Sequence, residues 1–181
     1  MKQTKLKWGQ TYHIYNRGNN RGQIFFEDEN YAYFMSLYMK YLLSYVELYA
    51  YCLLQNHFHL LLRIKEQEQI SSGSKVPISS MFGTFFGTYV KAINHRYKRT
   101  GSLFEGRYQR KEVKNDNQLF STLVYIHQNP QKHGLVSSFE DWPYSSYQHY
   151  LDRDPDDLIA PSLIHDSLSY DSIMELHNLI V

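Results

Sequence analysis

The sequence has little that would suit an extracellular or membrane-bound protein. Its 181 residues include a single cysteine, Cys52, so neither an intramolecular disulfide nor a CxxC zinc site can form. No apolar run approaches the length of about 18 residues that a membrane span needs, and the basic N-terminus lacks the apolar core of a secretory signal. Internal repeats and long low-complexity segments are also missing. We therefore expect a soluble intracellular protein built on one globular domain, long enough to bury a core without disulfides or a structural metal.

Charge of both signs is present, but it is unevenly distributed along the chain. Residues 1–139 carry 18 Lys and Arg against 9 Asp and Glu, whereas residues 140–181 carry one against 9, for a net charge of +1. Aromatic residues make up 16% of the chain, including 17 Tyr and 10 Phe. A basic body rich in aromatic rings is typical of surfaces that bind phosphates and stack unpaired bases. A tyrosine-rich core with solvated charges would give the same composition.

Residue periodicity predicts an alternation of strands and helices. Strand patterns occupy residues 11–16, 46–54, 57–64 and 107–114. Apolar residues at helical spacing predict helices over residues 29–44, from Pro77 to before Gly101, and from Asp116 to Asn129. The polar, Ser-rich residues 66–80 are the best candidate for a mobile loop.

Several local signals are expected to shape these helices. Asp28 and Asp116 are suited to cap the first and third helices, and Pro130 should end the third helix at Asn129. Gly83 and Gly87 lie four residues apart in the second helix, and this spacing favours close packing against a neighbouring element.

The order of the first six elements is strand, helix, strand, strand, helix, strand. This order predicts an α+β protein with the ferredoxin-like split βαβ fold, in which an antiparallel sheet carries its helices on one face. The third helix would be an addition to that fold. We expect residues 1–150 to form this domain and residues 151–181 to form a short acidic tail. The fold alone does not specify a chemistry.

Two histidines in the third predicted strand are the first candidate site residues. His57 and His59 flank Phe58, and residues two apart on a strand face the same side, about 7 Å apart along the chain. The two imidazoles can therefore converge on one metal while Phe58 points into the core. Two ligands leave other coordination positions open, and a catalytic ion needs open positions for substrate oxygens.

A tyrosine and an asparagine in the third predicted helix are the second candidate pair. Tyr125 and Asn129 are four residues apart and share one helix face. A tyrosine hydroxyl is a weak nucleophile at neutral pH, but a cation acting on the phosphate that it attacks can make it competent. The Asn129 amide oxygen is a neutral donor that could complete a two-histidine metal site.

These motifs, taken in order, resemble those of a known family. The motifs stand at residues 15–18, 24–26, 56–61, 106–108, 125–130 and 142–147. Together they resemble the single-tyrosine HUH transposases, and most of all the branch associated with repetitive extragenic palindromes (REP). The resemblance extends from about Gln10 to Tyr150, which is most of the chain.

The resemblance implies a specific activity. Members have a ferredoxin-like core and cut single-stranded DNA next to a hairpin in the bacterial cytoplasm. His57 and His59 would be the ligands of a divalent metal, Mg²⁺ or Mn²⁺, and Tyr125 would be the nucleophile. Asn129 would match the polar residue that joins the metal site one helical turn later. Attack by Tyr125 would leave a 5′-phosphotyrosine and a free 3′-OH, and a second 3′-OH could reverse the step and rejoin the strands.

The expected partner is single-stranded or hairpin DNA, with no role for a membrane. Residues 89–114 carry eight Lys and Arg against two Glu, so this segment should contact phosphates. Two further arginines stand in a Gly- and Asn-rich loop, where glycine permits close approach. The predicted DNA-binding residues are Arg17, Arg21, Arg96, Lys98, Arg99, Arg107, Arg110 and Lys111. A homodimer and a monomer both remain open.

Other interpretations remain open at this point. The chain could be a DNA-hairpin-binding protein that keeps the scaffold but has lost catalysis. A nucleotide hydrolase with an HxHxH motif is disfavoured because Leu61 stands where the third histidine would be. Related replication and conjugation initiators often bring a third histidine to the metal, and either His127 or His133 could join the site here.

Overall fold

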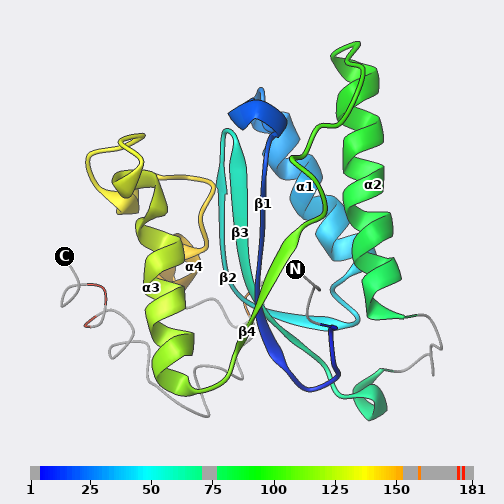
Figure 1. Cartoon of the computed structure of the whole chain (residues 1–181). Helices are drawn as coiled ribbons and strands as arrows, with labels where there is room; N and C mark the ends of the chain where they lie inside the picture. Colours follow the sequence, from blue (N-terminus) through cyan, green and yellow to red (C-terminus); the bar gives the residue numbers. More distant parts are fainter. Residues whose placement is uncertain (1–4, 71–76, 153–158, 160–174, 176, 178–181) are drawn as a thin grey trace.

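The predicted strands form one antiparallel sheet. In the computed structural model, β1 (Thr11–Arg17), β2 (Val46–Leu54), β3 (His57–Ile64) and β4 (Gln109–Val113) are arranged in the order β2-β3-β1-β4 (Figure 1). The structure describes residues 5–70 and 77–152 and the single residues 159, 175 and 177. β2 and β3 have the predicted bounds, and the two residues between them, Gln55 and Asn56, close the predicted hairpin.

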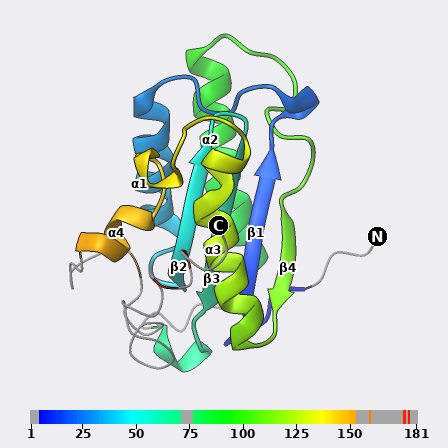
Figure 2. The same cartoon turned by 90° about the vertical axis from the view of Figure 1, so that its left-hand side faces the viewer.

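The helices lie on both faces of this sheet. α1 (Asp28–Tyr41) and α2 (Ile78–Arg96) pack together on one face, and α3 (Asp116–Lys132) covers the other face (Figures 1 and 2). A short helix, α4 (Tyr147–Asp152), follows α3. The element order and the strand order confirm the ferredoxin-like α+β prediction, and the added third helix covers the face that α1 and α2 leave open.

The core lies between the sheet and the α1–α2 layer. Because side chains alternate along a strand, Phe58 faces this layer while its two histidine neighbours face α3. The Phe58 ring is fully buried, and its centroid lies 5.3 Å from that of Phe34 on α1 and 5.2 Å from that of Phe86 on α2. Burial of one such side chain contributes about 2–3 kcal/mol, so this face of β3 anchors the strand that carries the histidines.

The far edge of β2 is covered by the segment that follows α3. The backbone nitrogen of Leu53 donates to the Tyr144 carbonyl at 2.9 Å, and the Ser146 nitrogen donates to the Tyr51 carbonyl at 2.9 Å. The Trp142 indole donates to the Leu53 carbonyl at 3.0 Å. These bonds satisfy backbone groups that an open sheet edge would leave exposed.

The helix ends differ from the predictions. α1 ends at Tyr41 rather than at residue 44, and its N-cap position is Glu27, so that Asp28 is its first residue. The N-cap of α3 is Asn115, whose side chain accepts a hydrogen bond from the Gln118 nitrogen at 3.0 Å. The prediction that Asp28 and Asp116 cap these helices was therefore wrong by one residue in both cases.

Two predictions about α3 and α2 were also wrong. Pro130 does not stop α3 at Asn129, because the helix continues to Lys132. A proline in the last turn forfeits one hydrogen bond, and the His133 nitrogen still closes the turn on the Asn129 carbonyl at 2.9 Å. A side chain at Gly83 or Gly87 would meet nothing within 4 Å, so neither glycine mediates close packing.

Two predicted segments lie partly outside the described residues. Residues 71–76 of the predicted mobile loop over residues 66–80 are not among the described residues. The same is true of most of the predicted acidic tail, residues 151–181. In the described part of the chain, no helix is both long and apolar enough to cross a membrane.

Candidate functional site

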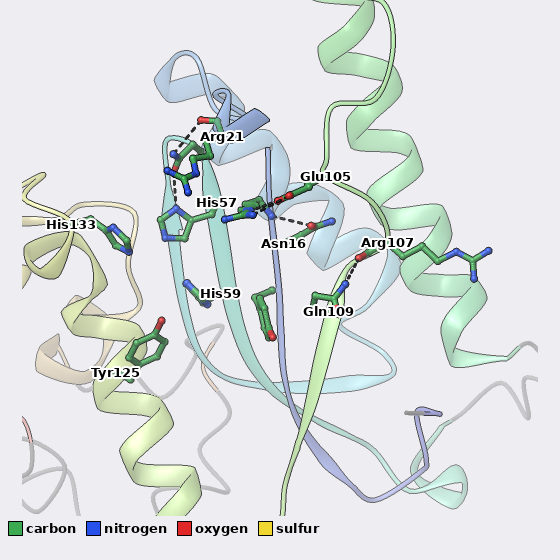
Figure 3. Close-up of a pocket in the computed structure, with 12 residues that line it drawn as sticks. Asn16, Arg21, His57, His59, Glu105, Arg107, Gln109, Tyr125 and His133 are labelled. Atoms are coloured by element: carbon green, nitrogen blue, oxygen red, sulfur yellow. Dashed lines mark hydrogen bonds and ion pairs between the residues drawn. The ribbon is translucent and has the colours of Figure 1, made fainter. Parts of the chain in front are cut away.

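The strand register gathers the candidate residues at one end of the sheet. β1 pairs Tyr15 with His59 and Arg17 with His57, and residues directly opposite each other in an antiparallel pair point to the same face. A cavity of about 810 Å³ lies between this face and α3, and twelve side chains line it (Figure 3). His57, His59 and Tyr125 are among them, so the sheet and α3 bring three of the four predicted catalytic and metal-site residues together.

Each of the two histidines has one ring nitrogen already engaged. Their ring centroids are 5.2 Å apart and their planes are nearly perpendicular, at 89°. The His57 Nδ1 lies 2.6 Å from the Asn56 Oδ1, so this nitrogen carries the proton and donates. The His59 Nδ1 lies 2.9 Å from the His13 Nε2. In both rings the Nε2 atom is therefore the nitrogen left to bind a ligand.

His13 is a site residue that the sequence analysis missed. It lies on β1, is 9% exposed, and forms its hydrogen bond with a residue 46 positions away in the sequence. Partners of this kind fix the tautomer and the orientation of a metal-binding imidazole. No local motif identifies His13, because its contact with His59 depends on the pairing of β1 with β3.

Burial keeps these imidazoles neutral at physiological pH. Desolvation, with smaller contributions from His133 and Arg17, lowers the pKa of His57 to about 4. Desolvation and then the charge of Lys111 lower the pKa of His13 to about 4. Desolvation, followed by the neighbouring histidines, also places the pKa of His59 well below its usual value. A neutral imidazole is the form that coordinates a metal.

These lowered pKa values predict a loss of stability in mild acid. An unfolded histidine has a pKa near 6.5, so between about pH 6.5 and pH 4 the unfolded chain binds more protons than the folded chain. The free energy of unfolding should therefore fall as the pH falls through this window, by up to about 1.4 kcal/mol per pH unit for each buried histidine. Urea unfolding of the protein from pH 7.5 to pH 4.5 measures this slope.

One variant tests the origin of the slope. His13→Gln removes a group whose pKa is lowered by burial, so it should make the pH dependence of the unfolding free energy shallower. Equal unfolding free energies at pH 7 and pH 5 would contradict the prediction.

α3 presents Tyr125 to the cavity. Leu119, Leu123 and Ile126 form the buried face of this helix, and Tyr125 stands beside that face with 41% of its surface exposed. Its ring centroid lies 5.7 Å from that of His59 and 6.2 Å from that of His13. Figure 3 shows its hydroxyl pointing into the cavity toward the histidines. The phenol is thus accessible to a substrate that enters the cavity.

The fourth predicted residue, Asn129, does not line the cavity. It is 1% exposed, and its Nδ2 donates to the Tyr125 carbonyl of the preceding turn at 2.7 Å. His133, one further turn along, does line the cavity, and its ring centroid lies 4.7 Å from that of His57. Among the described residues, no three His, Cys, Asp or Glu side chains already form a metal site.

His127, the other histidine considered for the site, is engaged elsewhere. Its side chain is fully buried, with Nε2 lying 2.7 Å from the Ser146 Oγ and Nδ1 lying 2.8 Å from the His177 Nε2. The cavity is lined by His133 instead.

Two of the predicted DNA-binding arginines lie at the mouth of the cavity. Arg17 ends β1 and pairs with Glu105, with Nη2 and Oε1 2.9 Å apart, and Arg21 follows in the short 3₁₀ turn. The turn needs glycine at position 18, because a Cβ there would lie 1.9 Å from the Gly22 carbonyl oxygen.

The remaining predicted DNA-binding residues fall into two groups. The first group lines cavities. Arg107 lines the main cavity, and Arg107 and Arg110 both line a second cavity. Lys111 lines a third cavity together with His13 and Tyr125. A second group at the end of α2 lines none of these cavities and comprises Arg96, Lys98 and Arg99. Arg96 pairs with Glu27, and the Arg99 guanidinium lies 5.7 Å from the centroid of the Phe26 ring.

Comparison with known families accounts for this combination of fold and residues. Residues 6–129, well over half of the chain, match the model of the family described as IS200-like transposases. The chain therefore belongs to the IS200-like transposase family.

Two relatives carry a more specific description. The chain is 30% identical over 104 residues to a Haemophilus influenzae protein provisionally named a REP-associated tyrosine transposase. That match covers 56% of this chain and 58% of the relative, so the chain spans about three fifths of the relative's length. The structure of a REP-associated tyrosine transposase bound to a REP hairpin has the same fold, with a TM-score of 0.65 over 87% of this chain and 90% of that chain at 18% identity.

Proposed function

We propose that this transposase nicks and rejoins single-stranded DNA beside palindromic hairpins, through a 5′-phosphotyrosine intermediate that depends on a divalent metal. The observation that carries the proposal is the meeting of the Tyr125 phenol with the His57–His59 pair in one cavity. The resemblance to REP-associated tyrosine transposases, one of them bound to a REP hairpin, supports the choice of hairpin DNA as the partner.

The residues in the cavity fit a divalent ion. His57 and His59 are neutral, and each keeps its Nε2 atom for a ligand, as described above. Imidazole suits Mn²⁺ better than Mg²⁺, which prefers oxygen ligands. A bound ion would neutralise charge on the scissile phosphate and polarise one of its oxygens. The sequence points to Asn129 as the third ligand: its Nδ2 donates to the Tyr125 carbonyl, and its Oδ1, the atom that would bind the ion, takes no part in that bond.

The chain's own residues then position and carry out the transfer. Tyr125 attacks the phosphorus in line, so that a bond forms from its Oη to phosphorus and the bond from phosphorus to the 3′ oxygen breaks. The phenol gives up its proton, and the leaving 3′ oxygen gains one. Phosphoryl transfer needs mainly alignment and charge neutralisation, and Arg17 and Arg21 at the cavity mouth would hold the phosphates on either side.

Removal of a phosphate contact should show in the salt dependence of binding. Arg107→Ala is expected to weaken hairpin binding and to lower the slope of log affinity against log salt by about 1, since each phosphate contact releases about one counterion. Lys40→Ala removes the same charge from the exposed last turn of α1 and should leave the slope unchanged. Equal slopes for wild type and Arg107→Ala would show that Arg107 does not contact a DNA phosphate.

A direct test uses the DNA that flanks the protein's own gene. Oligonucleotides from that DNA, incubated with the protein and Mn²⁺ or Mg²⁺, should yield a covalent protein–DNA adduct and a free 3′-OH fragment. Failure to form an adduct with any hairpin substrate, together with tight binding, would instead favour a hairpin-binding protein that has lost catalysis.

A further inference from the structure

A network of buried polar side chains connects α3 to β2. At its centre is His127, which is fully buried and has a hydrogen-bond partner at each ring nitrogen. Desolvation, followed by the charges of His177 and His149, lowers the pKa of His127 well below its usual value, so the ring is neutral. A neutral imidazole donates from one nitrogen and accepts at the other. His127 therefore uses its full hydrogen-bonding capacity inside the protein.

Ser146 joins this histidine to the sheet. Its Oγ lies 2.7 Å from the His127 Nε2 and accepts a hydrogen bond from the Tyr51 backbone nitrogen at 2.8 Å. The backbone nitrogen of Ser146 donates to the Tyr51 carbonyl at 2.9 Å, and Ser146 is itself fully buried. These hydrogen bonds connect α3 to β2 through a single serine.

The bond to Ser146 constrains the rotation of α3 about its own axis. Leu119, Leu123 and Ile126 hold the helix by apolar burial, which has no preferred direction. A hydrogen bond weakens steeply as its angle changes, so the bond between His127 and Ser146 allows little rotation. An apolar side chain would fill the same space without the cost of burying a polar group, and packing alone therefore does not account for a histidine here.

The rotation of α3 determines where the hydroxyl of Tyr125 lies. Consecutive helix residues are rotated by about 100°, so His127 and Tyr125, two residues apart, project to nearly opposite sides of α3. A rotation of about 10° would move a phenol oxygen that is about 9 Å from the axis by about 1.5 Å. A displacement of about 1 Å in a reacting group can cost about a hundredfold in rate.

We propose that His127 is a positioning residue: its hydrogen bond to Ser146 fixes the rotation of α3 and so directs the Tyr125 hydroxyl toward the histidine pair. This inference rests on the proposed function, because it takes Tyr125 as the nucleophile. It gives a role in the reaction to a buried side chain that lines none of the three cavities described above.

The test compares three variants by the single-turnover rate of adduct formation at saturating hairpin DNA with Mn²⁺. His127→Leu fills the same space without a hydrogen bond, and it should slow adduct formation at least about tenfold while hairpin affinity stays within about twofold of wild type. His127→Gln keeps a polar atom near the position of Nε2, so it should restore most of the rate. Val124→Ala, the control, removes buried packing from α3 but keeps the network, and it should retain the rate while lowering the melting temperature.

A second measurement does not depend on catalysis. In protein labelled with fluorotyrosine, the fluorine resonance of Tyr125 is the one that Tyr125→Phe removes. This resonance should shift in His127→Leu, return to its wild-type position in His127→Gln, and stay unshifted in Val124→Ala. Thermal unfolding checks that each variant folds.

If His127→Leu did not fold, Ser146→Ala would break the same hydrogen bond from the other side, with the same expected loss of rate. A wild-type rate in a folded variant that lacks the bond would overturn the proposal. Equal rates for His127→Leu and His127→Gln, or an equal loss in Val124→Ala, would also overturn it. If the wild type formed no adduct, the proposed function would fail, and the fluorine resonance would still decide whether His127 positions Tyr125.

Discussion

Tyr125→Phe is expected to abolish the covalent adduct between the protein and a cut oligonucleotide, a loss of at least about a thousandfold, because it removes the attacking oxygen. Hairpin affinity should stay within about twofold of wild type, since the phenyl ring keeps its place beside His59 and Tyr125 is 41% exposed. Denaturing gel electrophoresis of labelled DNA detects the adduct, and anisotropy measures the affinity.

Tyr15→Phe is the decisive control for this experiment. Tyr15 lines the same cavity, and its ring centroid lies 5.9 Å from that of His59, almost as near as the 5.7 Å of Tyr125. Distance alone therefore does not distinguish the two phenols. We expect Tyr15→Phe to retain the adduct, and an adduct that survives Tyr125→Phe but disappears in Tyr15→Phe would assign the nucleophile to β1.

His57→Ala and His59→Ala should each reduce cleavage by at least about a hundredfold while leaving hairpin binding largely intact, because they remove proposed metal ligands and no phosphate contact. Titration with Mn²⁺, followed by electron paramagnetic resonance, should show weaker binding in both variants. This readout does not depend on catalysis.

The two variants should differ in stability. His59→Ala leaves the buried His13 ring without its hydrogen-bond partner, and this costs about 1–3 kcal/mol. His57 is only half-buried and bonds to the adjacent Asn56, so His57→Ala should cost less. If both variants failed to fold, or both bound Mn²⁺ as tightly as wild type, the ligand assignment would be wrong.

The sequence predicts the sheet well because its signals are local. The polar residues Gln55 and Asn56 interrupt a continuous apolar run, and the bounds of β2 and β3 follow from that interruption. The alternation of side chains along a strand also correctly places Phe58 in the core. The end of α3 was mispredicted because a proline disrupts a helix interior far more than a last turn, and sequence alone does not show which position Pro130 occupies.

The site was predictable only where its residues share an element. His57 and His59 share a strand, and Tyr125 and Asn129 share a helix, so their spacing could be interpreted before the fold was known. Spacing did not reveal that the Asn129 side chain turns back onto its own helix. The contact between His13 and His59 depends on which strand pairs with β3, and that pairing is a property of the whole sheet.

The alternation along β3 separates two kinds of constraint. Phe58 and Leu60 point to the α1–α2 side of the strand and are buried in the core, whereas His57 and His59 point to the opposite side and line the cavity. Selection can therefore alter the chemistry of this strand without loosening its anchorage. A single inserted residue within the strand would exchange the two sets and remove both at once.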